Sequence, residues 1–263
     1  MKEAKPLPYQ AVLEQLMACG QIKAWSLIVT ILGDLAAEKG ARVSGPALTQ
    51  LTEPMGLKPE ALRVAIHRLR RDGWLVSERE GRTSLYGLSD HGRTLTKSVF
   101  HRVYGAAPEL PKKWLIVVAQ NAEALQAVDH PELLPISPRT GLLADVTADV
   151  PEGVLAWAAE PGAMPGWVKS ALVDEELSAA YGALLPALDA ALKVEPPEGV
   201  MARAVLRLVA LHQWRRLVLR HGAAAEALMG QQWAGAMCRA RVTRLLALLE
   251  LPEGELLRLT GGA

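Results

Sequence analysis

The chain has 263 residues, half of them hydrophobic, and its 29 lysines and arginines nearly balance 28 aspartates and glutamates. This length allows one large domain or two to three small ones. Cys19 and Cys238 are too few for a disulfide framework or a cysteine-rich zinc site. The first ten residues lack the apolar core of a signal peptide, and no run approaches the ~18 apolar residues of a membrane span. We therefore expect a reduced, soluble, cytoplasmic protein.

The charge is distributed unevenly along the chain. Residues 1–105 carry 15 lysines and arginines against 10 acidic residues, whereas residues 106–200 carry 5 against 14. Residues 201–263 are basic again, with 9 against 4. A basic segment attracts polyanions, so the first 105 residues are the expected partner of a nucleic acid.

The first helices are predicted from apolar spacing. Residues 9–19 predict a lead-in helix, and residues 24–38 a strongly apolar one that ends before Gly40. Ser44 is a predicted N-cap for a short third helix. The apolar face of the second helix is expected to comprise Trp25, Ile28, Leu32 and Leu35.

Residues 57–88 predict a basic helix followed by a hairpin. Pro59 suits a first helical position, and Asp72-Gly73 suits a helix end because glycine adopts the left-handed conformation at little cost. Residues 74–76 and 85–88 read as two strands joined by a turn at Glu80-Gly81. The predicted buried face of the helix is Leu62, Ala65, Ile66 and Leu69. Helix and hairpin in this order predict a winged helix-turn-helix.

The rest of the chain predicts a small α+β region and then helices. Residues 89–104 predict a linking helix before a proline-containing break. Strands are predicted at 114–119, 141–146 and 154–157. A short helix is predicted at 123–128, and a long helix, interrupted or kinked at Pro186, at 166–192. After a second break, helices are predicted at 201–220, which we interpret as amphipathic, and at 234–250.

The predicted DNA-binding residues lie on the polar face of the basic helix and on the hairpin. Arginine suits guanine through its two-pronged donor geometry, and charged and hydroxyl groups suit phosphate oxygens. A solvated helix face is the alternative, but a basic hairpin beside it favours DNA. Trp74 and Tyr86 are interpreted as packing residues, and Arg68 is placed nearer the buried boundary. The predicted contacts are Lys58, Arg63, His67, Arg70, Arg71, Arg79, Arg82, Thr83 and Ser84.

These residues and a C-terminal block resemble the PaaX family of bacterial transcriptional repressors over nearly the whole chain. The C-terminal block includes Leu211-His212, Trp214-Arg215-Arg216, Leu219-Arg220 and Trp233-Ala234-Gly235, where the family has Trp-Pro-Gly. The chain departs from the family in residues 120–131, which contain no arginine and are shortened. In the hairpin region the resemblance rests on Arg63, Arg68-Leu69, Gly73-Trp74-Leu75, Arg79, Gly81-Arg82, Ser84, Tyr86 and Gly92.

The resemblance implies an α+β architecture with three domains: a winged helix-turn-helix at 1–107, a small ferredoxin-like, Cas2-like domain at 108–196 and a helical domain at 197–263. It further implies a homodimeric repressor of phenylacetate catabolism genes that leaves its operator DNA when an acyl-CoA effector, phenylacetyl-CoA, binds. His212, Arg215 and Arg216 are candidate effector contacts, with a structural role as the alternative.

Two other classes of function stay open. One is an enzyme with an attached winged domain, such as a CoA-ester hydrolase or a nuclease, and the other is an assembly module that binds proteins. Asp145, Asp149, Glu175 and Glu176 have no metal-ligand spacing, so a solvated acidic surface is the favoured interpretation. No nucleotide-binding or esterase motif is present in the sequence. We expect no catalytic residue, metal or cofactor.

Overall fold

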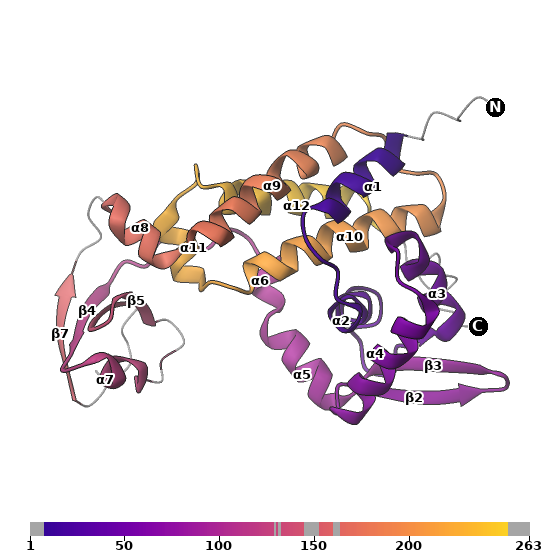
Figure 1. Ribbon diagram of the computed structural model, residues 1–263, viewed down its shortest axis with the longest axis horizontal. Coiled ribbons are helices and arrows are strands. Elements are labelled where there is room, and N and C mark those ends of the chain that lie inside the picture. The colour runs from indigo at the N-terminus through magenta and orange to yellow at the C-terminus, as the bar shows by residue number, and fades with distance from the viewer. Residues whose placement is uncertain (1–7, 129, 131–132, 145–152, 160–163, 252–263) are drawn as a thin grey trace. The chain divides into compact units, whose positions relative to one another are not determined.

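The computed structural model combines helices with two small antiparallel sheets (Figure 1). Two compact units are distinguished, one of residues 1–105, 183–216 and 240–263 and one of residues 106–182 and 217–239. The predicted three-domain division stays a prediction. No described helix is long and apolar enough to cross a membrane. The structure describes residues 8–128, 130, 133–144, 153–159 and 164–251.

The first unit begins with four α-helices, in the order that the apolar spacing predicts. α2 is the most apolar of them, but it ends three residues earlier than predicted and leaves Trp25 largely exposed, so Trp25 is not part of its buried face. A 3-10 turn at Glu53–Met55 ends at Gly56, whose φ is +75°. The helices are α1 Pro8–Ala18, α2 Ala24–Leu35, α3 Gly45–Thr52 and α4 Pro59–Arg71.

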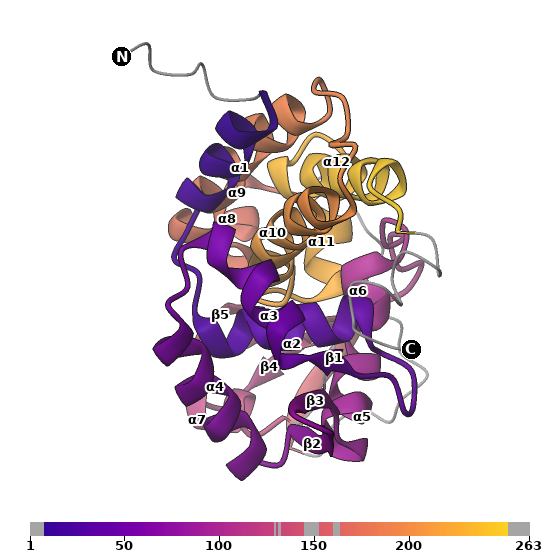
Figure 2. The same cartoon turned by 90° about the vertical axis from the view of Figure 1, so that its right-hand side faces the viewer.

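Local sequence signals fix the ends of α3 and α4. The Ser44 hydroxyl accepts a hydrogen bond from the Ala47 amide at 3.2 Å, which confirms the predicted cap. Gly73 follows α4 with a φ of +75°, the left-handed conformation that glycine permits. α4 packs on α2, as the two views in Figures 1 and 2 show. Its buried side chains are those predicted: Leu62, Ala65, Ile66 and Leu69.

A three-stranded sheet with the order β1-β3-β2 completes this region. β2 and β3 pair along their whole length, from Leu75 opposite Leu88 to Glu80 opposite Thr83. Gly81 makes the turn with a φ of +56°, so the predicted hairpin is confirmed and is longer than predicted. The strands are β1 Val43–Ser44, β2 Leu75–Glu80 and β3 Thr83–Leu88.

The predicted linking helix is two helices, α5 Asp90–Ser98 and α6 Phe100–Tyr104. Val99 separates them with φ −103° and ψ 1°, outside helical geometry. Valine is a poorer helix former than unbranched residues because a helix restricts its side-chain rotation. The single helix predicted at 89–104 is therefore wrong at this residue.

Three long helices cross the boundary between the two units. They are α9 Glu175–Ala191, α10 Val200–Val218 and α12 Ala234–Leu248. α10 is buried on nearly all sides between Ala204 and Val218, so the predicted amphipathic pattern is wrong for this helix. A helix that is apolar on every side, or whose polar side chains are hydrogen-bonded to the protein, is normally surrounded by other helices.

The second unit contains a four-stranded antiparallel sheet with the order β5-β6-β4-β7. α7 Ala122–Gln126 covers one face through Leu125, which packs with Val117 and Leu143. Trp114 and Leu134 belong to a second cluster, with small side chains of α11 Ala223–Met229. The strands are β4 Trp114–Ala119, β5 Leu133–Ser137, β6 Thr140–Ala144 and β7 Val154–Ala159.

Three features of this unit differ from the prediction. β5 was not predicted; it contains Pro135 and lies at the sheet edge, where a missing backbone donor is tolerated. α11 lies between the helices predicted at 201–220 and 234–250, where no helix was predicted. The long helix at 166–192 is two helices, α8 Gly166–Leu172 and α9, because Asp174 caps α9 by accepting from the Leu177 amide at 2.6 Å. Positions 145 and 146 of the strand predicted at 141–146 lie outside the described residues.

Candidate nucleic-acid interface

The outward face of α4 is polar and mainly basic. Arg63, His67, Arg70 and Arg71 are all exposed, opposite the four buried apolar residues of the helix. Arg68, which the sequence placed near the buried boundary, is also exposed and belongs to this face. Lys58 lies just before the first turn and is exposed. The structure thus brings five of the predicted contacts together on one helix.

The ion pairs on this face are weak. Arg63 lies 3.6 Å from Glu60, and Arg68 and Arg71 lie 3.5 Å and 3.2 Å from Asp72. Exposed pairs of this kind contribute roughly 0–1 kcal/mol, so the arginines can exchange their carboxylate partners for phosphates at little cost. Within the described residues, the side chains of His67 and Arg70 have no hydrogen-bonded or ionic partner.

The basic face continues into a hollow between α4 and the hairpin. His67, Arg70 and Arg71 line it from α4, and Leu75, Val76 and Ser77 line it from β2. Its volume is about 490 Å³. Three cationic or ionisable side chains around one open hollow give a site for an anion such as a backbone phosphate.

The hairpin extends the basic surface beyond α4. Arg79 pairs with Ser84 across the strands, and Arg82 follows Gly81 at the tip. Both arginines are exposed, whereas Thr83 and Ser84 are half-buried. Arginine guanidinium groups on a narrow projection are well placed for phosphate contacts, which fix orientation without reading sequence. Thr83 and Ser84 are therefore less accessible to a phosphate than the prediction assumes.

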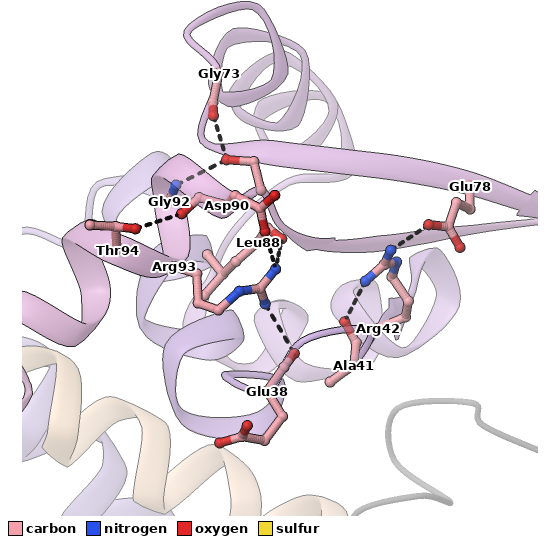
Figure 3. Close-up of polar contacts among 11 residues, drawn as sticks. Glu38, Ala41, Arg42, Gly73, Glu78, Leu88, Asp90, Gly92, Arg93 and Thr94 are labelled. Atoms are coloured by element: carbon pink, nitrogen blue, oxygen red, sulfur yellow. Dashed lines mark hydrogen bonds and ion pairs between the residues drawn. The ribbon is translucent and has the colours of Figure 1, made fainter.

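Hydrogen bonds of the Ser89 hydroxyl join the segments that follow α4 and β3, and Figure 3 labels their partners Gly73 and Gly92. The Ser89 hydroxyl donates to the Gly73 carbonyl oxygen at 2.6 Å and accepts from the Gly92 amide at 2.9 Å. A side chain at Gly92 would clash with the Trp74 carbonyl, so only glycine fits this approach. Ser89 therefore links the cap of α4, the end of β3 and the start of α5.

Two arginines brace the hairpin from the other side (Figure 3). Arg42 forms an ion pair with Glu78 on β2 and donates to the Ala41 carbonyl oxygen at 3.0 Å. Arg93 on α5 donates to the carbonyl oxygens of Glu38 at 3.1 Å and Leu88 at 3.3 Å. The sequence analysis did not identify Arg42 or Arg93, because tertiary structure determines their partners. The two arginines position the basic surface and need not touch a ligand.

The three predicted effector contacts on α10 have different surroundings. His212 is fully buried, with Nδ1 3.1 Å from the Thr30 hydroxyl oxygen. Arg216 donates to the Cys19 carbonyl at 2.9 Å and to the Gln213 side chain at 3.2 Å. Arg215 lines a small pocket with Tyr104, and burial lowers the pKa of its guanidinium. His212 and Arg216 thus have structural partners, and Arg215 is the one of the three that lines this pocket.

Buried His212 predicts a specific acid sensitivity. Burial, followed by the charges of Arg215 and Arg216, lowers the pKa of His212 to about 4. The unfolded chain takes up this proton near pH 6.5, so stability is fully present above pH 6.5 and is lost as pH falls toward 4. Between pH 8 and pH 5 the loss from this group is on the order of 2 kcal/mol.

Urea unfolding at pH 8 and pH 5 measures this loss against a His212→Gln variant, whose side chain does not titrate. We expect the variant to lose less stability on acidification than the parent, by on the order of 2 kcal/mol. Equal losses in the two proteins would show that His212 is not the source of the acid sensitivity.

Metal binding has no support in the described residues, where no group of three or more His, Cys, Asp or Glu side chains is placed to hold an ion. Glu176 instead pairs with Arg220 at 2.8 Å, as expected of a solvated acidic surface. Asp145 and Asp149 lie outside the described residues.

Comparisons with known proteins show what the segment that carries this surface is similar to. The family described as PaaX-like protein matches residues 23–92, which contain α2, α4 and the hairpin. The chain is also 29% identical over 248 residues to the transcriptional repressor PaaX of Escherichia coli strain K12, covering 83% of this chain and 78% of that protein. The chain is thus similar to PaaX proteins both in this segment and along most of its length.

A solved structure has a fold similar to that of this chain. The uncharacterized protein Rv0674 from Mycobacterium tuberculosis matches with a TM-score of 0.53 and 22% sequence identity. The match covers 87% of this chain and 96% of that one, and at this identity it concerns the fold alone.

Proposed function

We propose that this PaaX-like protein is a transcriptional repressor that binds operator DNA through α4 and the β2–β3 hairpin as a winged helix-turn-helix. The basic outward face of α4, continued by Arg79 and Arg82 on the hairpin, is the observation that supports this proposal. The likeness to a protein named as a transcriptional repressor supports it further. That name describes a regulator rather than an enzyme, so we assign the chain no catalytic role.

We further propose a regulated, cytoplasmic homodimer. On this proposal, an acyl-CoA effector, phenylacetyl-CoA, releases the protein from the promoter of phenylacetate catabolism genes. The sheet order β5-β6-β4-β7 is that of a ferredoxin-like domain, which supports the proposed Cas2-like middle domain. The proposed effector contacts are His212, Arg215 and Arg216, of which Arg215 lines a pocket.

Converting Arg63, Arg70 and Arg71 to alanine is expected to weaken binding to the upstream promoter by about a hundredfold or more. Each arginine that neutralises a phosphate also releases counterions, so the slope of log K against log salt should become shallower by about 0.9 per lost contact. Gel-shift titrations at several salt concentrations measure both quantities. α4 buries none of the three side chains, so the fold should be unchanged.

A matched control removes three other exposed cations, Lys112, Lys193 and Arg244. This variant has the same net charge as the first but should bind DNA within about twofold of the parent. Normal retardation of the promoter by the α4 variant would contradict the proposed interface. An equal loss of DNA affinity in the two variants would mean that DNA binding depends only on the total charge of the protein.

The effector proposal is tested separately on the protein–promoter complex. Phenylacetyl-CoA should release the DNA, whereas free phenylacetate should not. No change with either compound would remove the proposed ligand and leave the repressor proposal standing. If Arg215 contacts the effector, an Arg215→Gln variant should need more phenylacetyl-CoA for release.

A further inference from the structure

One residue on the outward face of α4 cannot bind a phosphate. Val64 is 70% exposed, in the middle of a helix whose other exposed residues are almost all charged or ionisable. At 100° per residue, the side chain of Val64 points within roughly 30° of the direction opposite the centre of the buried face. It is therefore near the centre of the surface that α4 presents outward, with Arg68 and Arg71 as neighbours at i+4 and i+7.

The surroundings of Val64 distinguish it from an ordinary exposed apolar residue. Single exposed valines are common and need no explanation in general. Val64 has the small exposed Ala61 at i−3 as an apolar neighbour, whereas Glu60, His67 and Arg68, at i−4, i+3 and i+4, are polar, so the apolar surface is too small to bind another protein. A single apolar group among donors matches the major groove, where guanine offers acceptors and thymine offers a methyl group.

We propose that Val64 contacts the 5-methyl group of a thymine and so makes α4 prefer thymine at one position of each operator half-site. This inference rests on the proposed function, because it requires α4 to lie in the major groove. The Val64 side chain has a single stiff rotamer in a helix, so its methyl groups are held in place before DNA binds. The neighbouring arginines would then contact guanines or phosphates on either side.

Uracil substitution tests the contact, because uracil lacks only the 5-methyl group of thymine. Each thymine of the operator is replaced by uracil in turn, and dissociation constants are measured for the parent and for Val64→Ala. For the parent, one position in each half-site should lose about fourfold in affinity, the value of one buried methyl-sized group. At that position Val64→Ala should lose less than twofold, since the partner methyl group is already gone.

Two controls separate the possible results. Val64→Ala should bind DNA without an operator as tightly as the parent does, since no phosphate contact changes. Alanine is a better helix former than valine, so α4 should be retained, which circular dichroism can verify. Equal uracil effects in the two proteins at every position would overturn the thymine contact alone. Failure of the parent to prefer its promoter over unrelated DNA would overturn the proposed function as well.

Discussion

Asp34→Asn is expected to lower the free energy of unfolding by about 3 kcal/mol, because it leaves Arg207, whose side chain is only 16% exposed, without its counter-charge. Asp34 on α2 is 2% exposed, and its two carboxylate oxygens accept from Arg207 Nε at 2.7 Å and Nη2 at 2.8 Å. Tyr104 on α6 donates to the same carboxylate at 3.0 Å. The pair thus links α2, α6 and α10.

The ionisation of the partners depends on this carboxylate. Burial pulls the pKa of Arg207 down, but the hydrogen bond and charge of Asp34 more than offset this, so the pKa is raised. Burial, then the charge and hydrogen bond of Asp34, raises the pKa of Tyr104 as well. Arg207 also donates to the Leu246 carbonyl oxygen at 2.8 Å, which does not replace the negative charge.

Tyr104→Phe is the matched control for Asp34→Asn, because it removes one hydrogen bond and no charge. It should cost about 1 kcal/mol in the same urea titration. A double variant, Asp34→Leu with Arg207→Leu, should recover much of the stability, since removing both charges leaves no unpaired one. A cost for Asp34→Asn no larger than that for Tyr104→Phe would show that the ion pair contributes no more than an ordinary hydrogen bond.

The local signals in the sequence predicted the helix and hairpin of residues 57–88 well. Apolar spacing in residues 59–71 identified the buried face of α4 residue by residue, and Gly73 and Gly81 identified the helix end and the hairpin turn. These features depend on neighbours within a few residues, so the apolar periodicity and the positions of glycines are sufficient to predict them. The sequence analysis did not single out Val64, because no local sequence pattern marks a valine as exposed. Its exposure is visible only in the structure.

Long-range features could not be predicted in this way. Asp34 and Arg207 are 173 residues apart, and nothing in the local pattern of either helix indicates the other. α10 was interpreted as amphipathic from its apolar residues, such as Leu206, Val209 and Leu217. Its polar residues His212, Gln213 and Arg216 are nevertheless hydrogen-bonded inside the structure. The edge strand β5 was missed because Pro135 argues against a strand, and only the sheet order shows that its position tolerates proline.

Glu226→Gln is expected to lower the stability of the second unit by about 3–5 kcal/mol. Glu226 on α11 and Arg239 on α12 form a two-pronged ion pair, with Nε–Oε1 and Nη2–Oε2 distances of 2.6 Å and 2.7 Å. Their side chains are 3% and 6% exposed, so neither group can recover its hydration when the other is neutralised. Urea unfolding, followed by hydrogen exchange of peptides from α11 and α12, measures the loss and its location.

Glu176→Gln provides the same chemical change at the surface of the same unit. Glu176 pairs with Arg220 at 2.8 Å but its side chain is 81% exposed, so the change should cost less than about 0.5 kcal/mol. Glu226→Leu combined with Arg239→Met should be markedly more stable than Glu226→Gln alone, because no buried charge is left unpaired. Similar stabilities of Glu226→Gln and Glu176→Gln would contradict this prediction, because they would require water to reach Arg239. In that case the apolar contacts of α11 with Trp114 and Leu134, rather than the ion pair, would hold the helix in place.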